Sequence, residues 1–176
     1  MTKRRDSYIM EEKNAEDGKM EEMDAELEEM TERFRELYAD FAGGCAGAEE
    51  DGRWNGEEYG SMEGYAFAAL SGAILSLIVS DGNVGERETE LLNRNFGFDY
   101  TVDGLLELYG YAARDILSNA AENAGECASL IDKTDEELGK TFRDLLLLAC
   151  DILSRCEDGV SEAESDTVGK LKKAIA

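Results

Sequence analysis

The chain has 176 residues, a formal net charge of −23, no histidine and no proline. Its length suits one domain with an appendage, and the absence of histidine excludes Ser-His-Asp and Cys-His catalysis, histidine metal sites and an imidazole pH switch. β-branched residues are scarce and few runs alternate with period two, so we expect an all-α protein, a compact helical bundle.

The first predicted element is an acidic, amphipathic helix within residues 1–42. Residues 1–19 are mostly polar, and we expect a frayed or disordered start. From residue 20 on, apolar residues recur at alternating steps of three and four over three heptads, which is too short for a stable free coiled coil. The seam therefore packs on its own domain, on a second copy of the chain as a homodimer, or in the groove of another protein. The candidate partner-binding residues are Met20, Met23, Leu27, Met30, Phe34, Leu37 and Phe41.

Residues 43–60 are predicted to form a glycine-rich linker. Six glycines fall in this stretch and no long apolar run does. Glycine is costly inside a helix, which favours a loop. We expect the single tryptophan, Trp54, to pin this linker to the domain that follows.

Residues 61–176 are predicted to form the bundle. Its central helix covers about 63–80 and is apolar around nearly its whole circumference, which is typical of a helix with neighbours on every side. A capping box at 134–137 opens a second long helix. The other expected elements are helices at 86–95, from 101 or 103, and at 112–121, a loop near 123–125, and a last helix that begins with a capping box at 161–164.

Residues 65–92 and 149–169 share one pattern: an apolar helix, a stop at Asp-Gly, and an acidic restart. A shift of 76 residues aligns the two copies without a gap. We therefore predict an internal pseudo-two-fold repeat, in which two helix–turn–helix halves share one hydrophobic centre. The aligned pairs are Ala73 with Ala149, Leu77 with Leu153, Val84 with Val160, Glu86 with Glu162, and Glu88 with Glu164.

The two Asp-Gly turns have two interpretations. They are not EF-hands, because aligning Gly82 with the loop glycine places Leu77 and Val79 at the first and third ligand positions. As simple helix punctuation, each turn ends one helix and places glutamates at the positive end of the next helix dipole. If the repeat brings the turns together, they offer hard oxygen ligands for calcium, magnesium or manganese. The candidate metal ligands are Asp81, Glu86, Glu88, Asp158, Glu162 and Glu164.

At these residues the chain resembles the TerB-like (tellurite-resistance protein B-like) family. The family pattern is an apolar helix that ends in Ala/Ser-Asp-Gly, followed by x-Val/Ile and by a glutamate in the next helix. Ser80-Asp81-Gly82-Asn83-Val84 with Glu88 matches it, and Cys156-Glu157-Asp158-Gly159-Val160 with Glu164 matches with the Asp-Gly shifted by one place. The resemblance covers residues 61–176.

The resemblance implies a compact all-helical bundle with internal pseudo-two-fold symmetry and an acidic surface that binds metal ions. It also implies a non-enzymatic role in stress or phage-defence systems, often close to membrane-bound partners. By position, it carries the metal-binding role over to Asp81, Glu88, Asp158 and Glu164.

The remaining features concern location and charge. The four cysteines contain no CxxC pair, which indicates reduced, buried thiols in a cytoplasmic protein. No apolar segment follows the basic first residues, and 65–79 is too short to span a bilayer, so we expect no membrane insertion. The acids are spread evenly over both parts of the chain. Such a surface repels nucleic acids and anionic membranes and attracts cations and basic proteins.

Three functions remain. The first is a TerB-like binding module that acts through a basic or membrane-associated protein partner, with a divalent cation at its turns. The second is an acidic mimic of nucleic acid, of the phage-encoded inhibitor type, that blocks a DNA- or RNA-binding protein. An enzyme ranks third, because only carboxylate chemistry is left without histidine, a nucleophile motif or a phosphate-binding glycine loop. We therefore predict no catalytic residues.

Overall fold

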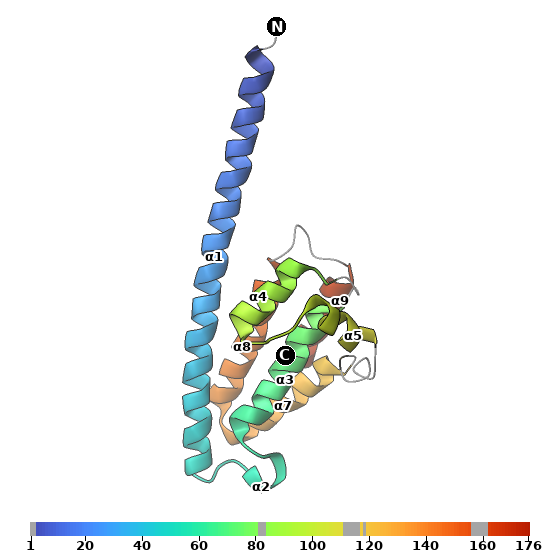
Figure 1. Ribbon diagram of the computed structural model, residues 1–176. Helices are drawn as coiled ribbons and strands as arrows, with labels where there is room; N and C mark the ends of the chain where they lie inside the picture. Colours follow the sequence, from blue (N-terminus) through green and yellow to red (C-terminus); the bar gives the residue numbers. More distant parts are fainter. Residues whose placement is uncertain (1–2, 81–83, 111–116, 118, 156–161) are drawn as a thin grey trace.

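A computed structural model describes residues 3–80, 84–110, 117, 119–155 and 162–176 of the chain (Figure 1). Side chains are described from residue 25 on, apart from those of 87, 88, 91 and 108–110. The described residues form packed helices and contain no strand, which confirms the predicted all-α bundle. The helices are α1 (Lys3–Glu50), α2 (Gly56–Tyr59), α3 (Met62–Ile78), α4 (Glu86–Phe96), α5 (Val102–Gly110), α7 (Ala120–Thr134), α8 (Glu136–Ser154) and α9 (Glu162–Ala174).

Helix α1 is longer than predicted at both ends. It begins at Lys3 rather than with a frayed segment, because residues 3–19 are rich in good helix formers such as Glu, Lys, Arg and Ala. It also continues to Glu50, so the predicted linker 43–60 is helical in its first part. The apolar seam continues past Phe41 with Cys45 and Ala48, both fully buried. Their burial offsets the roughly 1 kcal/mol that each glycine costs in a helix.

Most of the seam on α1 packs on the chain's own bundle. The helix lies against α8 and α3, and Leu27, Phe34 and Phe41 are part of the buried core. Met30 and Leu37 are partly buried against the same core. This part of the seam therefore docks on its own domain. Its five side chains do not form an open partner-binding surface.

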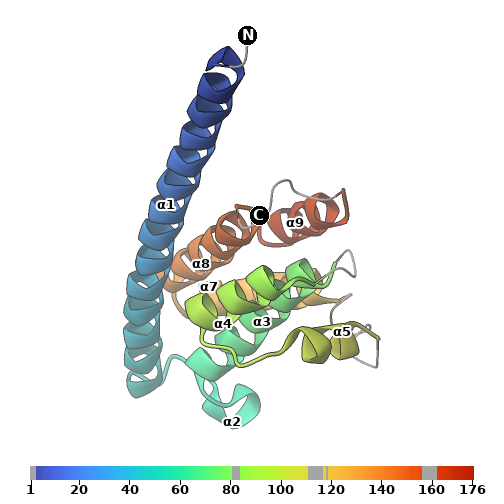
Figure 2. The same ribbon diagram turned by 45° about the horizontal axis from the view of Figure 1, so that its top comes forward.

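The N-terminal part of α1 extends past the other helices as a projecting arm, which we define as residues 3–24 (Figures 1 and 2). Met20 and Met23, the first two seam residues, lie in this arm. Among the described side chains of the helix, Leu27 is the first that belongs to the core, and it lies just beyond the arm. A charged contact also falls at this boundary, where Arg155 at the end of α8 pairs with Glu26.

The connection between α1 and α3 is held by aromatic packing. Trp54 is 8% exposed, and its indole N–H donates to the Gly60 carbonyl oxygen at 2.8 Å. Its ring packs against Tyr59 and Tyr65 at centroid distances of 5.5 and 5.8 Å. The expectation that Trp54 pins this connection to the bundle is confirmed. The connection itself is residues 51–61, shorter than predicted.

Helices α3, α7 and α8 form the centre of the bundle, with α9 packed on α7 and α3. No helix among the described residues has the combined length and apolar character that a bilayer crossing requires. Helix α7 is continuous through 123–125, where a loop was predicted. Gly125 does not mark a loop here but a close contact between two helices. A Cβ atom at this position would lie 2.5 Å from the Ala174 carbonyl oxygen at the end of α9.

The described helix boundaries agree with the predicted repeat. Helices α3 and α8 end at residues 78 and 154, and α4 and α9 begin at 86 and 162, so both boundaries differ by 76 residues. Several aligned positions are buried in both copies. These pairs are Ala66 with Phe142, Leu70 with Leu146, Ala73 with Ala149, and Ile74 with Cys150. Val84 is buried, as predicted, whereas its counterpart Val160 lies outside the described residues.

Candidate functional site

The structure describes only part of the two Asp-Gly turns and their acidic residues. Glu86 and Glu162 are the first residues of α4 and α9, and both are exposed. Glu164 is half-buried in the first turn of α9. Carboxylates in these positions stabilise the positive end of a helix dipole, which is what the punctuation interpretation requires.

The other three candidate metal ligands lie outside the side chains that the structure describes. Asp81 and Asp158 lie outside the described residues, as does the side chain of Glu88. Among the side chains that the structure describes, no three carboxylates or thiols come together in an arrangement that could hold a metal ion. Divalent-cation binding by the six candidate residues therefore stays a prediction, without an assembled site in the described part of the chain.

Helix α1 is strongly acidic from residue 11 to residue 32, whereas the first residues of the arm are basic. Residues 11–32, which span most of the arm and its junction with the bundle, contain 11 acids and two bases. A helix with this composition repels other anions and attracts basic protein surfaces at a range set by the Debye length, about 8 Å at physiological salt.

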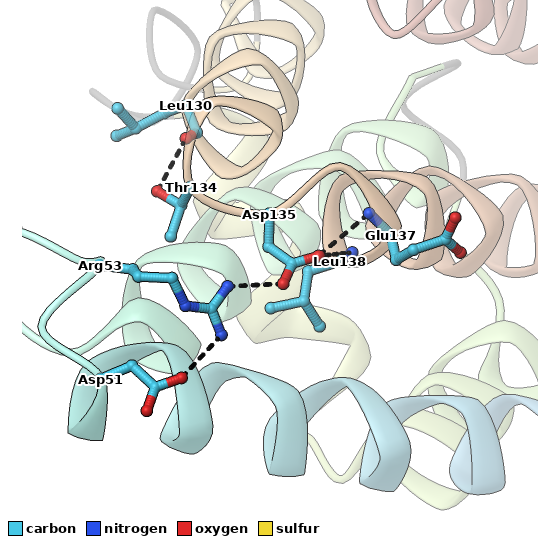
Figure 3. A network of polar contacts seen from close by, with 7 residues as sticks. All are labelled: Asp51, Arg53, Leu130, Thr134, Asp135, Glu137 and Leu138. Carbon is cyan, nitrogen blue, oxygen red and sulfur yellow. Dashed lines mark hydrogen bonds and ion pairs between the residues drawn. The ribbon is translucent and has the colours of Figure 1, made fainter.

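A polar network fixes the opposite end of α1 to the bundle (Figure 3). Arg53, three residues after α1, donates to Asp135 Oδ2 at 2.6 Å and to Asp51 Oδ2 at 3.3 Å. Asp135 is the N-cap of α8, and its Oδ1 accepts from the backbone N–H groups of Glu137 and Leu138 at 3.1 and 3.2 Å. The Arg53 guanidinium and these N–H groups lower the pKa of the Asp135 carboxyl below its ordinary value. The cap was predicted one residue earlier, at Thr134.

A second arginine joins three segments of the bundle. Arg143 of α8 pairs with both carboxylate oxygens of Asp132 at the end of α7, and its Nε donates to the Ile175 carbonyl oxygen at 2.9 Å. Gly139 leaves the space that the Asp132 side chain occupies. This contact therefore orients the α7–α8 connection and holds the chain's C-terminal end.

The described cysteines are buried thiols. Burial raises the pKa of Cys45 and Cys127 to about 12 and that of Cys150 to about 11. At neutral pH these side chains stay protonated, and a thiol is a much weaker nucleophile than a thiolate. They act as small apolar core residues.

An aromatic cavity of about 330 Å³ lies between α1, α3 and α4. Phe34 of α1 packs edge-on against Phe96 at the end of α4, with ring centroids 5.0 Å apart. Phe67 of α3 is 43% exposed and packs on Phe98 at 6.4 Å. The cavity also has polar walls, formed by Arg35, Ser71, Arg94 and Asn95.

Sequence reasoning did not find this cavity, because its walls come from three segments that are far apart in the chain. Only local signals existed: Phe34 and Tyr38 one helical turn apart, and Phe96-Gly97-Phe98 after α4. Neither pattern identifies the segment that it faces.

Comparisons with protein-family models, with curated proteins and with solved structures gave no match to this chain. The TerB-like resemblance therefore stays a prediction that rests on the two Asp-Gly turns.

Proposed function

We propose that this chain is a non-enzymatic, acidic binding module of the TerB-like type, which binds a basic protein partner through the arm of α1. The resemblance suggests a stress or phage-defence setting, with a cytoplasmic location and divalent-cation binding as further parts of the same proposal.

The observation that carries the proposal is the arm itself. It continues a helix that is anchored in the core by Leu27, Phe34 and Phe41, yet it extends past the bundle (Figure 1). Short helices are marginally stable alone in water, and a helix gains most of its stability from packing. A partner that covers the arm would supply that packing, and the acidic stretch 11–32 favours a basic surface on that partner.

The experiment is affinity purification with the full-length chain from cells that express it, followed by mass spectrometry. The arm variant replaces Glu11, Glu12, Glu21 and Glu22 with glutamine. The matched control also removes four negative charges, by replacing the exposed bundle residues Glu107, Glu122, Asp144 and Asp151 with their amides.

We expect basic partners that bind the wild type and the control but not the arm variant, with affinity that falls as salt rises. Partners that are retained equally by all three chains would contradict the proposal. Capture of nucleic-acid-binding proteins that both variants weaken equally would instead support the nucleic-acid mimic, because that function depends on total charge.

A further inference from the structure

An open groove of about 1020 Å³ lies between α7 and α9. Three lysines line it, Lys133 at the end of α7 and Lys170 and Lys173 of α9. All three are exposed, and none pairs with a carboxylate among the described residues. Such a cluster of cations is unusual for this chain, in which acids outnumber bases by 41 to 18.

The positions of these lysines have only a partial structural explanation. Lysines in the last turn of a helix complement the negative end of its dipole, which accounts for Lys133 and Lys173 but not for Lys170. Glu122 and Glu126 of α7 line the same groove, yet no ion pair joins either of them to a lysine in the described part of the chain. The three ammonium groups are therefore available to carboxylates from another molecule.

The groove also has apolar walls. Tyr59 of α2 and Tyr65 of α3 are half-buried, with ring centroids 5.6 Å apart, and Leu130 of α7 is a third half-buried wall residue. The volume is about that of two turns of an α-helix, taken as a cylinder about 10 Å wide. Lysines beside apolar walls in a space of this size suit an acidic, amphipathic helix.

The arm of α1 has this chemistry. Residues 16–24, EDGKMEEMD, contain five acids and one base. The two methionines at positions 20 and 23 fall on one face of the helix, and flexible thioether side chains pack well against aromatic rings. The arm extends past its own bundle as part of one continuous helix, so it does not reach the groove of its own chain (Figures 1 and 2).

We propose that the groove between α7 and α9 binds the acidic part of the arm, residues 11–24, of a second copy of the chain. This inference rests on the proposed function, because it names the basic partner of the arm. Arm and groove are different surfaces, so the contact is head-to-tail and further copies can add in a row. The interface is small and its charge pairs are exposed, so the association is weak and weakens further as salt rises.

The test is sedimentation equilibrium of the full-length chain at concentrations up to about 1 mM, where small interfaces associate. The arm variant is the one defined above, with four glutamates replaced by glutamine. The groove variant is Lys133→Gln, Lys170→Gln, Lys173→Gln. Its matched control removes three positive charges from exposed positions outside the groove, by Arg33→Gln, Arg94→Gln, Lys140→Gln. We expect the average mass of the wild type and of the control to rise with concentration, whereas each variant alone stays a monomer.

Mixing the two variants gives the decisive measurement. The groove variant keeps its arm and the arm variant keeps its groove, so together they should form a 1:1 heterodimer and nothing larger. Circular dichroism checks that every chain is folded. The inference is overturned if the wild type stays a monomer, if either variant alone associates like the wild type, or if the mixture contains no heterodimer.

The proposed function can survive that result. If the wild type is a monomer but the arm variant still loses basic proteins in affinity purification, the arm binds a different partner and only the present inference fails. If the groove variant loses captured acidic proteins while the wild type is a monomer, the groove binds another protein, which also overturns the assignment to a second copy.

Discussion

Arg53 and Asp135 join the end of α1 to the start of α8, with Arg53 Nη1 2.6 Å from Asp135 Oδ2 (Figure 3). The two residues are 82 positions apart in the chain. Because Asp135 also caps α8, one carboxylate contributes both to a local helix end and to the seating of α1.

Replacing this cap gives the first prediction. Asp135→Ala removes the acceptor for two backbone N–H groups and should lower the free energy of unfolding by about 1 kcal/mol. For a chain of this size that corresponds to a melting temperature lower by about 2–4 °C, measured by calorimetry. The control Asp51→Ala removes only an exposed partner of Arg53 and should have little effect. An equal loss in both variants would contradict the capping role.

The charge of Asp135 gives a pH dependence. Asn caps helices about as well as Asp, so the wild type and Asp135→Asn differ mainly in the charge. The folded-state pKa of Asp135 is lowered from its ordinary value of 3.8, so its stabilising contribution is present above that value. The contribution is lost as pH falls through the lower, folded-state pKa. Urea unfolding at pH 7 and at pH 2–3 should show a smaller difference between the two chains at the lower pH. A difference of the same size at both pH values would show that the charge is not its source.

Two helical glycines should respond to alanine in opposite directions. Gly43 lies inside α1 with open space around its missing Cβ, so Gly43→Ala should stabilise the protein by roughly 0.4–1 kcal/mol. Gly125→Ala should destabilise it by about 1–3 kcal/mol, because the new methyl group meets the backbone of α9. Chemical unfolding of both variants measures these changes. A destabilised Gly43→Ala would argue that 43–50 is not helical.

The buried thiols predict a loss of stability in alkali. The folded-state pKa of Cys127 is raised from 9.0 to about 12, so the unfolded chain releases this proton at a lower pH than the folded chain. Its contribution is complete below pH 9 and is lost as pH rises toward 12. Unfolding free energy measured between pH 8 and 10.5 should fall less steeply in Cys127→Ala than in the wild type. Equal slopes would mean that the thiol is not protected by burial.

The divalent-cation hypothesis predicts a saturable rise in melting temperature with Ca²⁺, Mg²⁺ or Mn²⁺. At a free concentration 100 times Kd, one bound ion stabilises the fold by about 2.7 kcal/mol. The double variant Glu162→Gln, Glu164→Gln should abolish the rise, whereas the exposed pair Glu122→Gln, Glu126→Gln should keep it. A small, non-saturating rise that is the same in every chain would indicate charge screening instead.

Local sequence signals predicted much of the fold. Thr101 accepts an N-cap bond from the Gly104 N–H, at one of the two positions predicted to begin that helix. Ser61 accepts the corresponding bond from the Gly64 N–H, two residues before the predicted start of the central helix. The 76-residue repeat predicted that α3 and α8 end at equivalent positions, which they do. These features depend on residues close together in the chain, so their physical causes can be read from a short stretch.

Features that depend on tertiary contacts were predicted poorly. Glycines suggested loops at 43–50 and 123–125, but Gly44 and Gly125 instead permit close approach of other segments. Their function as spaces for Leu138 and Ala174 is not visible without knowledge of which helices meet. The aromatic cavity was missed for the same reason. The partner-binding interpretation of the α1 seam was wrong for the five residues that the bundle itself covers.

The continuity of α1 has a mechanical consequence. At 1.5 Å per residue, the 24 residue steps from Lys3 to Leu27 place the tip of the arm about 36 Å from that core residue. Since one helix contains both the anchored section and the arm, its rotation about its own axis is set by the core. Each added residue would turn the tip by about 100°, so the core fixes the direction in which each face of the arm points as well as the reach of the arm.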